Sequence, residues 1–361
     1  MARVKNQILA DFAFEHHGTS QLASTLGEYE AMADWRYMLS YPERIKAVSP
    51  ADVQRVAQKY FLAHNRTVGH FIPEKVQEVN VLERNLSYDT QDNLPQSKQS
   101  QGPSTRSVQS FSFAKNAHLM LQENHLDETV AIRGNIYAGS INDPAGKHGL
   151  AELTAEMLER GTKKNNKLAL ASKLESMGSQ INIASEQERT QVFGRSLAKH
   201  LPETLTLLNE MLQEPAFTAE EFEKLKKHRL DALSQRLDNT DIQAKETLYA
   251  SLYPQGHPHA LSTQTRLDEL KTLTLEDVKA FYKKHYGSNQ MILTLVGDID
   301  SPQVKQQVDQ LWGQWPADNP VLVEIPEIAA QTKGQQVIKT MKDKANDSIA
   351  MGVQTNLTLG D

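Results

Sequence analysis

A helix start that leads into a strand occurs twice in this chain, and this repeat constrains the fold most. Residues 49–60 read Ser-Pro-Ala-Asp-Val-Gln-Arg-Val-Ala-Gln-Lys-Tyr, and residues 274–286 read Thr-Leu-Glu-Asp-Val-Lys-Ala-Phe-Tyr-Lys-Lys-His-Tyr. In each, a hydroxyl residue stands three positions before an aspartate, which is typical of a capped helix N-terminus. Asp52 and Asp277 are 225 positions apart (277 − 52). The repeat therefore predicts that one structural unit of about that size is used more than once.

The first part of the chain reads as helices followed by a linker. Apolar periodicity predicts helices at 1–14, 21–38 and 50–61, and alternation at 67–73 predicts a strand closed by proline. Residues 1–79 are therefore interpreted as the C-terminal part of a repeat unit. Residues 80–107 have little to bury and hold two prolines within 93–105, which predicts a linker.

Residues 108–315 read as a nearly whole unit with grouped strands and helices. Strands are predicted at 111–113, 118–121, 129–137, 181–183, 192–197 and 291–297, of which 181–183 and 192–197 form a hairpin. Helices are predicted at 148–160, 167–177, 200–213, 218–237, 241–253, from Thr274 onward, and at 302–312. This grouping predicts an α+β fold with antiparallel-rich mixed sheets packed by helices, because strands and helices do not strictly alternate.

Both ends of the sequence read as interrupted units. The first helix pattern begins at residue 1 without a capping residue before it. Residues 320–361 contain two predicted strands, at 335–341 and 348–354, which cannot cover their own apolar face. We interpret 320–361 as the truncated start of a further unit and expect the sequence to be an internal fragment.

Composition excludes several functions. The net charge of −6 argues against nucleic-acid binding, which needs a surplus of basic residues on one face. The basic run 224–229 is interpreted as a solvated helix face. The chain has no cysteines, which excludes thiol nucleophiles and cysteine-bound zinc. No window approaches the roughly 18 apolar residues of a membrane span.

One stretch carries a specific resemblance. Residues 138–162 read Ala-Gly-Ser-Ile-Asn-Asp-Pro-Ala-Gly-Lys-His-Gly-Leu-Ala-Glu-Leu-Thr-Ala-Glu-Met-Leu-Glu-Arg-Gly-Thr. This stretch resembles the pitrilysin/insulinase (inverzincin) family of zinc metallopeptidases, in which the same frame encloses the motif His-x-x-Glu-His. Further matches in the expected order are Leu26-Gly-Glu-Tyr29 with Asp34-Trp35, Ala47-Val-Ser-Pro50, His257-Pro258, and Tyr286 through Gly297-Asp-Ile299.

The resemblance implies an architecture. The family is built from four repeated LuxS/processing-peptidase-like metallopeptidase units, in two halves that a linker joins and that close around a peptide. By analogy this chain would hold the end of unit two, the linker, unit three and the first strands of unit four. The catalytic helix would then belong to unit one, before residue 1. Bacterial relatives with export signals make a periplasmic or cell-envelope location the expectation.

The resemblance also locates the positions of the zinc motif. Its two histidines fall on Glu152 and Glu156, its general base on Ala155, and the third ligand near Asp231 and Ala232. A zinc peptidase needs two imidazoles and a glutamate base, and neither is present at these positions. We therefore expect no catalytic, cofactor-binding or metal-binding residue in this chain, and zinc in the missing catalytic half.

Three other polar groups contain residue types that can bind a metal ion. His148, Glu152 and Glu156 share one face at helical spacing, but ligands on one rod do not converge, so a solvated or groove-lining acidic stripe is expected. The triplet 15–17, Glu-His-His, is interpreted as a polar helix end. The triplet 257–259, His-Pro-His, is interpreted as a structural turn.

Three hypotheses for the function follow. The first is a non-catalytic, substrate-holding part of a pitrilysin-type peptidase, whose partners are a peptide or unfolded polypeptide and the missing catalytic half, without nucleic acid or membrane. The second is a structural or assembly subunit that shares the fold without activity. The third is an active zinc enzyme with unusual ligands, which the residues favour least.

Overall fold

The computed structural model describes residues 1–15, 19–68, 108–114, 116–254, 257, 260–316, 334–344 and 346–353. The predicted linker at 80–107 lies outside these ranges, as do residues 69–73 of the predicted strand at 67–73, whose residues 67 and 68 form no strand.

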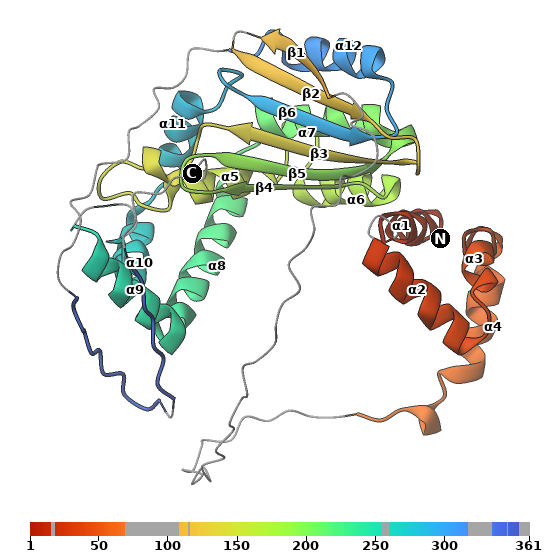
Figure 1. The fold of residues 1–361 in the computed structure, drawn as a ribbon, viewed down its shortest axis with the longest axis horizontal. Helices are drawn as coiled ribbons and strands as arrows, with labels where there is room; N and C mark the ends of the chain where they lie inside the picture. Colours follow the sequence, from red (N-terminus) through yellow and green to blue (C-terminus); the bar gives the residue numbers. More distant parts are fainter. Residues whose placement is uncertain are drawn as a thin grey trace.

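A six-stranded mixed sheet forms the centre of the molecule (Figure 1). Its strands, in the spatial order β1-β2-β6-β3-β5-β4, are β1 (Gln109–Ala114), β2 (Ala117–Glu123), β6 (Ile292–Gly297), β3 (Thr129–Ile136), β5 (Thr190–Leu197) and β4 (Gln180–Ser185). Only β2 and β6 run parallel; the other neighbouring pairs are antiparallel. The expected antiparallel-rich α+β fold is therefore confirmed, including the β4–β5 hairpin.

Helices cover one face of this sheet and bury its apolar side chains. They are α5 (Leu150–Leu158), α6 (Lys167–Met177), α7 (Leu201–Gln213), α11 (Leu275–His285) and α12 (Ser301–Trp312). Leu119, Ile132 and Leu293 on the strands are fully buried beneath them, as is Trp312 on α12. The opposite face carries more exposed side chains, including Met120 and Phe193, so the domain has two layers with one open sheet face.

Three further helices extend from the sheet domain beside α5. They are α8 (Ala219–Leu237), α9 (Thr240–Leu252) and α10 (Thr263–Thr272), drawn in green and teal below the sheet in Figure 1. The prediction contained α8 and α9 but lacked α10, which Ser262 caps by accepting a hydrogen bond from the Thr265 amide. Helix α8 contacts both α10 and α5. Together α8 and α10 frame a groove over α5.

Four helices form the described start of the chain, and the first of them packs against α6. They are α1 (Ala2–Glu15), α2 (Thr19–Met32), α3 (Arg36–Ala47) and α4 (Pro50–Tyr60). The single helix expected at 21–38 is wrong, because the helix ends at Met32 and a new one begins at Arg36 after a turn in which Asp34 accepts from the Arg36 amide. Ala10 of α1 is buried where it meets Gly178, whose φ of +65° ends α6.

The two strands expected at the end of the chain are not formed in the part that the structure describes. Residues 335–341 and 348–353 have no ladder partner there and lie along α9 instead. Lys339 donates to the Gln243 side chain, and Ser348 donates to Asp241. A strand needs a second strand to pair its backbone, and α9 offers only side chains at this surface. Among the described residues, no helix has both the length and the hydropathy to cross a bilayer.

Candidate functional site

The start of α5 is fixed by a half-buried carboxylate. Asp143 accepts hydrogen bonds from the backbone amides of Gly149 (2.7 Å) and Ala151 (2.8 Å) through its two oxygens. Gly149 has a φ of +94°, a left-handed conformation that glycine adopts without strain. Burial raises the pKa of Asp143 to about 7, against the two amide donors that lower it. The Gly-rich entry to this helix is thus held by its own loop.

The two positions that correspond to zinc-binding histidines are engaged in ion pairs. Glu156 pairs with Arg229 of α8, and Glu152 pairs with Arg266 of α10 at 3.4 Å. All four side chains are partly exposed along the groove. The expected groove-lining acidic stripe exists, but arginines neutralise it. The interpretation of 224–229 as a solvated face is wrong at Arg229, because that residue turns toward α5.

The general-base position and the third-ligand position also lack metal chemistry. Ala155 is fully buried against the sheet, and Asp231 is exposed on α8. Ala232, one position further, lines a small cavity of about 130 Å³ together with Glu152 and Arg229. Helix α8, which corresponds to the helix that carries the third ligand in the family, therefore lies opposite α5. At this position it has the methyl group of Ala232 at the cavity instead of a carboxylate.

His148 lies outside the helix that was expected to contain it. The helix begins at Leu150, two residues later, so His148 does not share its face with Glu152 and Glu156 by helical spacing. Its backbone amide and its Nδ1 both contact Glu269 of α10, at 2.7 and 2.6 Å. His148 therefore ties the entry loop to α10.

A larger cavity of about 430 Å³ opens beside these ion pairs. Residues of five segments line it: Ser140, Asp143, His148, Gly149, Glu152, Ser185, Glu186, Gln187, Arg236, Ile242, Lys245, Glu246, Tyr249, Leu261, Thr263 and Arg266. We call it the α5 cleft. Its wall combines aromatic and aliphatic surface with charges of both signs, which suits a polypeptide better than a small anion.

A zinc ion does not fit this donor set. Arg229 and Arg266 place two positive charges on the only carboxylates at the motif positions, and each would have to leave before a cation could bind. Within the described ranges, no group of three or more histidine, aspartate or glutamate side chains is placed to hold a metal. The expectation that this chain has no catalytic, cofactor-binding or metal-binding residue stays a prediction.

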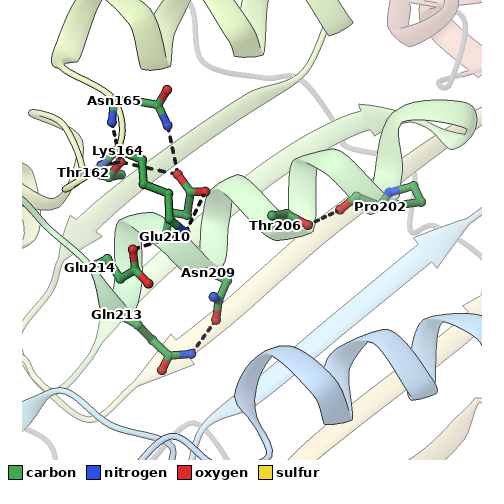
Figure 2. Close-up of polar contacts among 9 residues, drawn as sticks. All are labelled: Thr162, Lys164, Asn165, Pro202, Thr206, Asn209, Glu210, Gln213 and Glu214. Atoms are coloured by element: carbon green, nitrogen blue, oxygen red, sulfur yellow. Dashed lines mark hydrogen bonds and ion pairs between the residues drawn. The ribbon is translucent and has the colours of Figure 1, made fainter.

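The other end of α5 is held by a buried glutamate on α7. Figure 2 shows the side chain of Glu210, which belongs to α7, pointing toward the loop that follows α5. Asn165 donates to Glu210 at 2.9 Å, and Thr162 and Lys164 each lie 3.4 Å from its carboxylate. Lys164 also reaches Glu214 at 3.3 Å. The Gly-Thr segment that closes the motif frame is thereby fixed against the sheet domain, which positions α5 from both ends.

The remaining candidate histidines have structural surroundings where they are described. His257 is buried, and its ring stacks on Tyr253 with centroids 4.7 Å apart. Residues 258 and 259 lie outside the described residues, as do His16 and His17. Sequence reasoning missed Arg229, Arg266 and Glu269, because they reach α5 only through the crossing of α8 and α10.

Residues 118–262 match the family model of insulinase, peptidase family M16, and residues 272–358 match the model of the peptidase M16 inactive domain. The chain belongs to the M16 family. The resemblance predicted from residues 138–162 is therefore confirmed.

One of the similar proteins is named as a non-peptidase, and another is named as a subunit of a respiratory complex. The Helicobacter pylori protein named non-peptidase homolog YmxG is 30% identical over 195 residues, which are 53% of this chain and 44% of that protein. Cytochrome b-c1 complex subunit 1 of Bos taurus is 26% identical over 172 residues, 47% of this chain and 35% of that protein. The chain thus spans less than half the length of these curated relatives.

A solved M16 structure has the same fold. The crystal structure of a peptidase M16 inactive domain from Pseudomonas fluorescens has a TM-score of 0.57 and 26% sequence identity, and the match covers 62% of this chain and 54% of that one. This solved structure thus shares both sequence similarity and its fold with the chain.

Proposed function

We propose that this chain is a non-catalytic, substrate-holding part of a pitrilysin-type zinc metalloendopeptidase. The observation that carries the proposal is a degenerate motif in an intact frame. Asp143 and Glu210 fix the two ends of α5. Arg229 and Arg266 form ion pairs with the two glutamates that stand where the family has its zinc-binding histidines. A helix held in place beside an open cleft, without a metal set, supports binding rather than cleavage.

The partner of this chain is then the catalytic half of the parent protein. That half would carry the zinc ion and hydrolyse peptides with a zinc-activated water, and this chain would complete the chamber. The domain boundaries at 1–79, 80–107, 108–315 and 320–361 belong to the same proposal. An unfolded polypeptide is the expected ligand, because the α5 cleft joins apolar wall with charges of both signs.

The test measures peptide binding by the chain of 361 residues. A short fluorescein-labelled peptide of alternating valine and threonine is titrated with protein, and anisotropy gives the dissociation constant. Tyr249, a half-exposed aromatic on the cleft wall, is replaced by alanine. We expect Tyr249→Ala to weaken binding about tenfold, because aromatic anchors dominate such contacts.

The matched control removes an equally apolar side chain elsewhere. Leu126 is exposed in a turn away from the cleft, and Leu126→Ala should leave the affinity unchanged. Absence of binding by the unaltered chain, or equal affinity in all three proteins, would contradict the holding role.

A structural or assembly subunit is the second candidate. The similarity to a non-peptidase homolog and to a subunit of the cytochrome b-c1 complex favours it. Such a subunit would co-purify with partner chains in a fixed ratio and would not bind the labelled peptide. An active enzyme with unusual ligands would instead retain about one zinc per chain after dialysis, which metal analysis measures.

A further inference from the structure

Strand β4 is one edge of the sheet, and among the described residues no strand pairs with its outer side. The amide of Glu186 donates to the carbonyl of Arg189 at 2.7 Å, which closes the β4–β5 hairpin with a hydrogen-bonded pair. Hydrogen-bonded and non-bonded pairs alternate along an antiparallel ladder. The amides of Ile181, Ile183 and Ser185 therefore point away from β5, toward the free edge.

A side chain from α5 occupies the middle of this edge. The amide of Ile183 donates to Oε1 of Glu159, and Nδ2 of Asn182 donates to the same oxygen at 3.2 Å. Glu159 is the C-cap residue of α5, with helical φ and ψ of −85° and −5°. Because Asp143 and Glu210 fix α5 at both ends, the carboxylate is held against β4 by the helix itself.

The surroundings of this carboxylate are partly desolvated. Burial raises the pKa of Glu159, whereas the Ile183 amide, Arg160 and Lys167 lower it. Arg160 also pairs with Glu221 at 3.6 Å. Because its acceptor is a carboxylate, the Ile183 amide already has a strong hydrogen bond that an incoming peptide carbonyl would have to replace.

The β4 edge leads directly into the α5 cleft. Ser185, the last residue of β4, lines that cleft together with Glu186 and Gln187. An extended peptide that paired with β4 would therefore continue into the cleft. Such strand addition uses backbone hydrogen bonds for affinity, and the Ile183 amide is the central donor of this edge.

We propose that Glu159 closes the β4 edge against strand addition, so that an extended peptide can pair with β4 only by displacing this carboxylate. The inference rests on the proposed peptide-holding role and identifies Glu159 as the residue that controls access to β4. An edge strand with free donors also attracts other strand edges, and a side-chain acceptor on the edge prevents this. Glu159 thus selects ligands that compete for the Ile183 amide.

The test compares Glu159→Ala with the unaltered chain for the valine–threonine peptide. We expect about tenfold tighter binding by Glu159→Ala, equivalent to about one backbone hydrogen bond regained. Glu159→Gln keeps a weaker acceptor and should lie between the two. Glu223→Ala, which removes an exposed glutamate from α8, is the matched control and should bind as the unaltered chain does.

Two further measurements make the outcomes decisive. A peptide N-methylated at every residue has no amide donor on either edge and cannot pair with β4, so the gain should vanish with it. Amide exchange at Ile183 should accelerate in Glu159→Ala without peptide and slow again when peptide is added.

Accelerated exchange without a gain in affinity would overturn the proposal. Self-association of Glu159→Ala in sedimentation without peptide binding would overturn it in favour of simple edge protection. If the unaltered chain binds in a Tyr249-dependent manner and Glu159→Ala binds equally, the holding role stands and the control of access by Glu159 fails.

Discussion

At the scale of single residues, arginines beside α5 limit what its carboxylates can bind, and Arg229 is the clearest case. Arg229 comes from a run of basic residues whose pattern indicates a solvated face, yet it pairs with Glu156. A glutamate in a groove could bind a cation, but the guanidinium beside Glu156 already neutralises its charge. The loss of metal chemistry is therefore a charge compensation as well as the absence of histidines.

Asp143 gives the fold a pH dependence whose sign follows from its raised pKa. In the folded chain the group titrates at about 7, and its ordinary value is 3.8. Between these values the folded state binds more protons than the unfolded state, so stability falls as pH rises from about 4 to about 7. The effect is at most on the order of 4 kcal/mol.

Urea unfolding of the chain at pH 5 and pH 8 measures this effect. The unaltered chain should lose more stability over that interval than Asp143→Asn, whose amide does not titrate. At pH 5 the protonated carboxyl of Asp143 and the amide of Asp143→Asn each keep one carbonyl acceptor for the amides of Gly149 and Ala151, so the two proteins should have similar stability there. Equal pH slopes in the two proteins would contradict the assignment.

At the scale of elements, the repeated helix start is built in the same way twice. Ser49 and Asp52 form a capping box at α4, and Thr274 and Asp277 form another at α11. The equivalent faces nevertheless differ. Val278 of α11 is fully buried, whereas Val53 of α4 is 51% exposed. The two helices share their local sequence signal and differ in what covers them.

This difference predicts unequal mutational costs. Val278→Ala should lower the free energy of unfolding by about 2 kcal/mol, because it leaves a cavity in a packed core. Val53→Ala should change it by no more than about 0.5 kcal/mol, as for other exposed sites. Urea unfolding followed by circular dichroism measures both. A cost at Val53 comparable to that at Val278 would mean that α4 is packed in solution.

Sequence reasoning succeeded where the signal was local. The capping boxes of α4 and α11 could be predicted because every group in them lies within three positions. The positions of Glu152 and Glu156 on one helix were available from the resemblance. Their partner Arg266 was not, because it lies 114 positions from Glu152 and meets it only after α10 has folded.

The errors have a similar cause. The apolar segments at 335–341 and 348–353 alternate as strands do, but strand formation depends on a neighbouring strand that no sequence window contains. In the described residues these segments lie along α9. The break between α2 and α3 escaped because the apolar periodicity continues through the turn.

At the scale of the whole molecule, β6 joins the sheet together. It pairs with β2 on one side and with β3 on the other, and Leu293 and Leu295 are fully buried. Without it, the β1–β2 hairpin and the β3–β5–β4 sheet share no ladder. A central strand of this kind determines whether the domain is one cooperative unit.

Removal of β6 should therefore abolish cooperative unfolding. A chain that ends at residue 290 lacks β6 and α12, and we expect it to show a broad thermal transition and rapid amide exchange throughout β3. A chain that ends at residue 316 keeps both elements and serves as the control. A sharp transition in the shorter chain would show that the two halves of the sheet fold independently.

The central position of β6 also determines when the sheet can form during translation. Glu123, which ends β2, precedes Ile292, which begins β6, by 169 positions (292 − 123). While the ribosome synthesises these residues, β2 and β3 each have an apolar edge that is not yet paired with β6. Chaperone occupancy on the nascent chain should accordingly persist until residue 297 leaves the exit tunnel, and synonymous codons that slow translation before β6 would lengthen this vulnerable period.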